Sequence, residues 1–161
     1  MVNTTSASTK NDNYKTIVLK ECTSLKNTKF PANLQTLRLD NARSIINLDL
    51  SHCTQLTRLE ATKCAKLKIV TVPPQLQIIS IDQSPALDRF EKLTEGNLLE
   101  LSLHTCEKIK AIAPPASLTK LKVENCLKLV TIDNAQNLTN LNPESMEYVK
   151  RMTTPADNDE E

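Results

Sequence analysis

Residues 34–75 read LQTLRLDNARSIINLDLSHCTQ and then LTRLEATKCAKLKIVTVPPQ, two successive versions of one pattern, LxxLxLxxCxxLxxI. The pattern begins at Tyr14 and recurs every 20 or 22 residues, up to a truncated LTNLNPES that starts at Leu138. A fixed period of this length is typical of repeat proteins in which each repeat forms one turn of a solenoid. We therefore expect one elongated domain over residues 14–142.

The apolar columns of the pattern predict the path of each turn. The fourth and sixth positions are apolar and have polar neighbours, which is the period of a β-strand with one buried face. The twelfth and fifteenth positions are expected to line the return side of each coil. The segment 48–50, LDL, is similar to a strand motif of its own. However, Leu48 lies only eleven residues from Leu37 and Leu59, too few to close a coil, so we assign this segment to the return side.

With these columns in place, the chain resembles the leucine-rich repeat family, whose repeats run about 20 to 29 residues around LxxLxLxx(N/C)xL. The resemblance covers Tyr14 to about Pro143 and departs in having CxxL where the commonest form has NxL. LDLSHCTQLTRL is similar to the repeats of plant disease-resistance receptors, whereas the PPQL and PPASL joints are more similar to short repeats of bacterial effectors. The resemblance implies an α/β-type solenoid, a right-handed coil with a parallel concave sheet of about seven short strands and irregular or extended return segments.

The two ends of the chain differ from the repeats. Asn142 can act as the N-cap of a helix and Pro143 suits its first position, so we expect a short capping helix over residues 143–152. Residues 1–13 and the acidic residues 153–161 are polar and carry no apolar column. We expect both segments to be disordered.

Composition excludes several classes of partner. The chain has 20 Lys and Arg against 19 Asp and Glu, a net charge of +1, which argues against a nucleic-acid partner. Its one glycine, Gly96, excludes both the GxGxxG fingerprint and a P-loop. No apolar run approaches the roughly 18 residues of a membrane span, and the first thirteen residues lack the apolar stretch of a secretory signal. We expect no cofactor, no membrane partner and a cytoplasmic location, with delivery into a host cell as the alternative.

Cysteine is concentrated in one column of the repeat. The ninth position holds Cys22, Ala42, Cys64, Ser84, Cys106 and Cys126. In the family this position is a small inward-pointing residue that bonds to the backbone of the bend. Five cysteines at spacings unlike CxxC pairs argue against a disulfide framework and against a metal site. We expect five free thiols, with Cys53, outside this column, reacting faster than Cys64, Cys106 and Cys126.

Two cysteines lie close to histidines in the sequence. His104 precedes Cys106 by two residues and His52 precedes Cys53 directly. These residues, His104, Thr105 and Cys106, end a predicted strand. We expect Cys106 to point into the core and His104 towards solvent, on opposite sides of the strand. The carboxylates are spread among Lys and Arg and no two form a dry pair. We therefore predict no catalytic residues and no enzyme activity.

The exposed positions of the strands are the best candidate for function. The third, fifth, seventh and eighth positions of each turn should point to the concave surface, which at about 4.8 Å per strand is roughly 30 Å long and comparable to a standard protein interface. We predict that a protein partner contacts its charged residues, Arg38, Asp40, Arg58, Glu60, Lys63, Asp82, Glu100, His104, Lys120, Lys122 and Glu124. Because aromatic anchors are scarce, binding should depend on charge and be sensitive to salt.

The sequence therefore predicts a non-enzymatic protein-protein interaction module. One alternative is a bacterial effector acting in a host cell, or the substrate-recognition subunit of a ubiquitin ligase. A second alternative is a self-associating structural solenoid, because the first strand has little to cover it. We expect a monomer rather than an oligomer, and light scattering would separate these alternatives.

Overall fold

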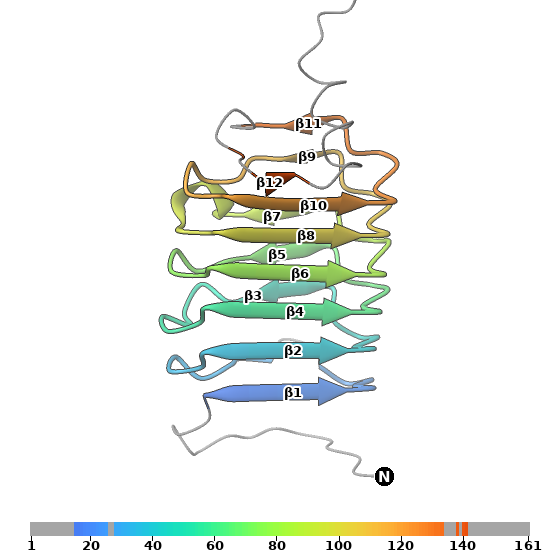
Figure 1. The fold of residues 1–161 in the computed structure, drawn as a ribbon. Coiled ribbons are helices and arrows are strands. Elements are labelled where there is room, and N and C mark those ends of the chain that lie inside the picture. Colours follow the sequence, from blue (N-terminus) through green and yellow to red (C-terminus); the bar gives the residue numbers. More distant parts are fainter. Residues whose placement is uncertain (1–14, 26–27, 134–137, 139, 142–161) are drawn as a thin grey trace, which may run out of the picture.

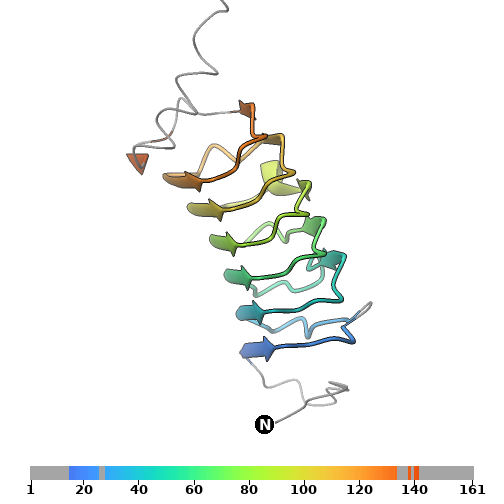
Figure 2. The same ribbon diagram turned by 90° about the vertical axis from the view of Figure 1, so that its right-hand side faces the viewer.

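The computed structural model describes residues 15–25, 28–133, 138 and 140–141, which form a stack of coils (Figure 1). One strand of each coil joins a large parallel sheet in the order β1-β2-β4-β6-β8-β10-β12. Its strands are β1 (Thr16–Lys20), β2 (Thr36–Asp40), β4 (Arg58–Thr62), β6 (Ile78–Asp82), β8 (Glu100–His104), β10 (Lys120–Glu124) and the two-residue β12 (Asn140–Leu141). Seen from the side, the stack bends towards the outer face of this sheet (Figure 2).

The return side of the coils is extended as well. Two smaller parallel sheets form there, one of β3 (Asn47–Asp49), β5 (Ile69–Thr71) and β7 (Arg89–Glu91), the other of β9 (Ala111–Ile112) and β11 (Thr131–Ile132). Leu48 pairs with Val70 in the register of β3 and β5. The assignment of the LDL segment to the return side is therefore confirmed. Between β7 and β8 the chain forms the 3-10 helix η1 (Leu93–Glu95).

The core lies between the large sheet and the return sheets and consists of stacked apolar columns. The fourth-position residues lie directly beside one another in the parallel register and are at most 1% exposed; they are Leu37, Leu59, Ile79, Leu101 and Leu121. Return-side Leu48, Val70, Ile112 and Ile132 are also buried. Each turn buries its apolar residues against its neighbours, so stability depends on the interfaces between turns.

A left-handed residue follows each of the six five-residue strands. The φ angles are between 49° and 55° at Glu21, Asn41, Lys63, Gln83, Thr105 and Asn125. This conformation is unfavourable for residues other than glycine, and asparagine tolerates it best. The neighbouring turn supports the bend through the backbone, as where the Lys63 N–H donates to the Asp82 carbonyl at 2.9 Å.

The parallel solenoid predicted from the repeat is confirmed, but its α/β-type class is not, because the return segments are extended and η1 is the one helical element in the described part of the chain. The predicted capping helix at 143–152 and the predicted disordered segments 1–13 and 153–161 lie outside the described residues. None of the described residues belongs to a helix with the length and hydropathy needed to cross a membrane.

Candidate functional site

The outer face of the large sheet presents three parallel rows of side chains, which we call the strand face. The rows follow from the register of β1, β2, β4, β6, β8 and β10, in which equivalent positions of successive turns lie side by side. The first row is Thr16, Thr36, Arg58, Ile78, Glu100 and Lys120; the middle row is Val18, Arg38, Glu60, Ser80, Ser102 and Lys122; the third row is Lys20, Asp40, Thr62, Asp82, His104 and Glu124.

The structure places the predicted binding residues on this face, with one exception. Lys63 lies in the left-handed bend that follows β4, beyond the end of the strand, with φ 55°. All the others lie in the three rows. The strand face thus brings together residues that are as many as 86 positions apart in the sequence, from Arg38 to Glu124.

Near the N-terminal end of the strand face, one carboxylate holds two arginines. The Nε atom of Arg38 lies 2.9 Å from Glu60 Oε2, and the Nε atom of Arg58 lies 2.5 Å from Glu60 Oε1. These three side chains are partly exposed, so solvent screens the pairs and each contributes about 0 to 1 kcal/mol to stability. Both guanidinium groups are nevertheless held in place before any partner arrives.

Ion pairs recur at the other end of the strand face. Lys120 Nζ lies 2.6 Å from Glu100 Oε1 on the neighbouring strand β8, and Lys122 Nζ lies 3.2 Å from Glu124 Oε1 on its own strand. Four of the predicted binding residues are therefore already paired within the chain: Arg38, Arg58, Lys120 and Lys122. A partner would meet pre-formed ion pairs rather than isolated charges.

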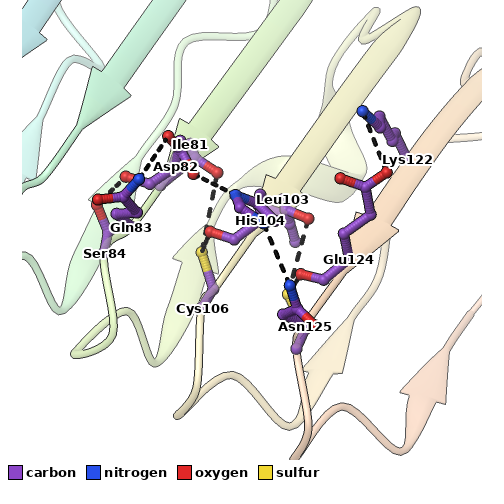
Figure 3. A network of polar contacts seen from close by, with 11 residues as sticks. Ile81, Asp82, Gln83, Ser84, Leu103, His104, Cys106, Lys122, Glu124 and Asn125 are labelled. Atoms are coloured by element: carbon purple, nitrogen blue, oxygen red, sulfur yellow. Dashed lines mark hydrogen bonds and ion pairs between the residues drawn. The ribbon is translucent and has the colours of Figure 1, made fainter.

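His104 joins three turns at the edge of the strand face where the strands end (Figure 3). Its Nδ1 atom lies 2.5 Å from Asp82 Oδ1 and its Nε2 atom lies 3.2 Å from Asn125 Nδ2. The partners assign the tautomer: Nδ1–H donates to the Asp82 carboxylate, and Nε2 accepts from the Asn125 amide. Both ring nitrogens are thus occupied, which leaves neither as a base for an incoming substrate. Cys106 is fully buried, so it does not share a surface with His104.

Between the two groups of ion pairs, the strand face contains a hollow of about 470 Å³ over β4, β6, β8 and β10. We call it the serine hollow; the strand-face residues that line it are Arg58, Ile78, Ser80, Glu100, Ser102, Lys120 and Lys122. Ser80 and Ser102 are opposite each other in the register of β6 and β8. Within the described chain, no hydrogen bond involves either hydroxyl. The hollow therefore offers two small polar groups among three cationic side chains and the carboxylate of Glu100.

The sequence analysis placed Ser80 and Ser102 on the exposed positions of the strands but did not include them among the binding residues, because it selected charged side chains. The signal that could have found them is the recurrence of a small residue at the fifth position of two successive turns. Small side chains beside long ones lower the surface locally. A hollow follows from that pattern once the register is known.

The ninth-position residues bond to the bend backbone, as the family resemblance implied. Cys64 Sγ lies 3.5 Å from the Thr62 carbonyl, Ser84 Oγ lies 3.3 Å from the Asp82 carbonyl, and Cys126 Sγ lies 3.5 Å from the Glu124 carbonyl. All five thiols are free and buried. The prediction that Cys53 is the more accessible thiol is wrong. Cys53 is 0% exposed because the turn after β3 packs its side chain into the core.

Cys53 and His52 do not form a nucleophile and base pair. The two side chains are 3.9 Å apart from Sγ to Nε2, but the same Nε2 lies 2.7 Å from the Phe30 carbonyl, which requires a proton on that nitrogen. Burial, with the nearby charge of Asp49, raises the pKa of the Cys53 thiol to about 11, so it stays protonated at neutral pH. In the described part of the chain, no three His, Cys, Asp or Glu residues are placed to hold a metal ion.

No protein-family model matches the chain, and the search of curated proteins found no match either. A solved structure that the fold resembles is a leucine-rich repeat protein from Bacteroides ovatus, with 13% sequence identity and a TM-score of 0.26. The alignment covers 87% of this chain, which spans 57% of that protein's length.

Proposed function

We propose that the chain is a leucine-rich repeat protein that binds a protein partner through its strand face, with the serine hollow as the central contact. The observation that carries the proposal is the hollow itself. It lies over four strands, and its two serine hydroxyls have no hydrogen-bond partner within the described chain. Protein interfaces use such a depression to receive a protruding side chain of the partner.

The chemistry of the hollow favours a polar or acidic side chain. The hydroxyls of Ser80 and Ser102 can each donate and accept a hydrogen bond. Arg58 and Lys122 line the same hollow and are 43% and 55% exposed. A carboxylate or amide of the partner could therefore bond to the serines and lie beside cations.

The ion pairs around the hollow reduce the entropic cost of binding. Arg58 is held by Glu60 and Lys120 by Glu100, so a partner has fewer flexible side chains to immobilise. Paired charges also attract a partner less strongly over distance than isolated charges do. We therefore propose that shape and hydrogen bonding at the hollow contribute more to affinity than net charge does.

Three roles remain possible for such a protein, and they differ in the identity of the partner and not in the surface that binds it. A bacterial effector in a host cell, a substrate-recognition subunit of a ubiquitin ligase and a cytoplasmic adaptor would each use the strand face to hold another protein. We propose the adaptor role, without enzyme activity of its own. Both ring nitrogens of His104 are hydrogen-bonded, and His52 donates to the Phe30 carbonyl beside a Cys53 thiol whose pKa of about 11 keeps it protonated. The partner's identity would decide among these roles.

The experiment is affinity capture from a cell lysate with three versions of the chain, quantified by mass spectrometry. The double variant Ser80→Arg/Ser102→Arg fills the hollow, and both positions point away from the core. The matched control, Ala65→Arg/Ala111→Arg, adds the same charge at exposed positions outside the strand face. The proposal predicts that a protein captured by the wild type and by the control is lost with the hollow-filling variant. Equal recovery by all three versions contradicts it.

A further inference from the structure

At the edge of the stack to which the strand arrows point, the chain bends and turns back towards the return side (Figure 1). The eleventh and thirteenth positions of the repeat follow this bend. Five of them are lysines, which we call the lysine edge: Lys66 and Lys68 of the third turn, Lys108 and Lys110 of the fifth, and Lys128 of the sixth. All five are exposed, whereas the twelfth-position residue of each of these turns is buried. The lysines therefore lie on the outer surface of the coils.

Backbone hydrogen bonds hold successive turns of this edge side by side. The Lys68 N–H donates to the Ile46 carbonyl at 2.7 Å, and the Asp88 N–H donates to the Lys68 carbonyl at 2.9 Å. Further along the stack, the Val130 N–H donates to the Lys110 carbonyl at 2.8 Å. Equivalent positions of adjacent turns are thus one strand spacing apart, so the third to the sixth turn extend the lysine edge over roughly 15 Å.

The lysine edge lacks the ion pairs that neutralise the cations of the strand face. Within the described chain, no hydrogen bond or ion pair involves any of its five ammonium groups. The tenth to thirteenth positions of the same four turns hold two acidic residues, Asp88 and Glu107, and Asp88 Oδ2 already lies 3.3 Å from Arg89 Nη1. Five lysines against the single carboxylate of Glu107 leave a local excess of four positive charges.

Exposed aliphatic side chains lie beside the lysines. Ile46 precedes Lys68 in the thirteenth-position row and is 45% exposed, and Val130, which follows Lys110, is 66% exposed. Leu127, at the tenth position of the sixth turn, is 81% exposed. Surfaces that lie on anionic membranes combine lysines, which are attracted to the lipid headgroups, with aliphatic groups that enter the boundary below them. The edge carries both kinds of group.

We propose that the lysine edge binds the surface of an anionic lipid bilayer. A nucleic acid would offer phosphates to the lysines but no apolar layer for Ile46 and Val130. Each lysine near such a surface strengthens binding about fivefold, so four net charges give half-maximal binding at about 1 mM lipid. The sequence-based expectation of no membrane partner rests on the lack of a membrane span, which peripheral binding does not need. No strand-face residue takes part, so the two proposals can fail separately.

The experiment is flotation of the full chain with vesicles of phosphatidylcholine, either alone or with about 30% phosphatidylserine, at about 0.1 M salt. The wild type should float with the anionic vesicles only. Lys108→Gln/Lys110→Gln should weaken that binding about 25-fold. The matched control Lys15→Gln/Lys20→Gln removes the same charge at exposed lysines of the first turn and should bind within about twofold of the wild type. Absence of wild-type binding, or equal loss in both variants, overturns the proposal.

A second variant distinguishes a bilayer from other polyanions. Ile46→Ser/Val130→Ser removes the aliphatic groups but no charge, and should weaken binding to the anionic vesicles about tenfold while circular dichroism shows the fold retained. Wild-type binding to a short DNA duplex, at the same phosphate concentration, should be weaker than binding to the vesicles. DNA binding as tight as vesicle binding overturns the proposal, because charge alone would then explain it. If the serine variant fails to fold, the lysine variant and the DNA comparison decide.

Discussion

Ser80 lies directly opposite Ser102 in the parallel register of β6 and β8, and both are middle-row residues of the strand face. Along that row, Glu60 precedes the two serines and Lys122 follows them. Two short side chains between two long ones lower the surface at the centre of the sheet. The sheet supports this arrangement rigidly, because the strands on either side share a continuous buried core.

The shared carboxylate of Glu60 gives a prediction about stability and salt. Glu60→Gln removes the partner of both Arg38 and Arg58, and because the pairs are exposed the free energy of unfolding should fall by less than about 1 kcal/mol. The loss should shrink in high salt, which screens surface charges. Urea unfolding at two salt concentrations measures it. Glu107→Gln, the same charge change at an exposed residue, is the control, and an identical salt dependence in both variants would contradict the pairing.

The stacked core column predicts a large effect at Leu101, which is 1% exposed. Leu101→Ala should lower the free energy of unfolding by about 2 to 5 kcal/mol, because the turns above and below cannot close the cavity fully. Leu127→Ala, at a residue that is 81% exposed, should change it by less than about 0.5 kcal/mol. Urea midpoints compare the two. An unchanged midpoint for Leu101→Ala would show that the register of the repeat is wrong.

The left-handed bends predict a stabilising substitution. Thr105 has φ 52°, which a β-branched side chain disfavours and asparagine tolerates. Thr105→Asn should therefore raise the free energy of unfolding by about 0.5 to 1 kcal/mol. Lys63→Thr, the opposite kind of change at a bend with φ 55°, should lower it. Thermal unfolding of both variants measures the effect, and the reverse order of stability would rule out the bend geometry.

Thiol reactivity should follow burial and pH. Burial raises the pKa of Cys53 from 9.0 to about 11, and burial also raises the pKa of Cys22 and Cys64. The native chain should therefore react slowly with iodoacetamide at pH 8, and Cys22, 9% exposed, should react first. In denaturant, all five cysteines should react quickly. Reaction of native Cys53 at the denatured rate would contradict its burial.

The same pKa shift determines how stability depends on pH. The folded chain disfavours the thiolate form of Cys53. The protonated thiol therefore makes its full contribution to stability below pH 9, and this contribution is lost as the pH rises towards 11. Unfolding midpoints measured across this range should fall with pH. Cys53→Ala should show a smaller fall than the wild type.

Much of the fold could be predicted from the sequence because the buried columns recur at a fixed period. Leu37 and Leu59 mark the large sheet and Leu48 the return side, and the structure places each of them there. The left-handed bends could not be predicted as a set, because four of the six carry Glu, Lys, Gln or Thr, where glycine or asparagine would have been the signal. There the hydrogen bonds of the adjacent turn override local preference.

The candidate site was harder to predict than the fold. The repeat indicates the strand face and places Arg38 and Arg58 near acidic residues, but only the structure shows that Glu60 pairs with both. The predicted binding residues are the charged ones, so Ser80 and Ser102 are not among them. Small side chains become informative only when their neighbours in space are known.

The most direct measurement of the central claim is photo-crosslinking from the strand face. A benzophenone amino acid placed at Thr62, a strand-face residue of β4 that does not line the hollow, should crosslink one protein from a cell lysate, and excess unlabelled wild-type chain should suppress the product. The same group at Ala111, which lies exposed on the return sheet, should give no competed product. A competed crosslink at Ala111 with none at Thr62 would contradict the account, because the partner would then bind the return side and not the strand face.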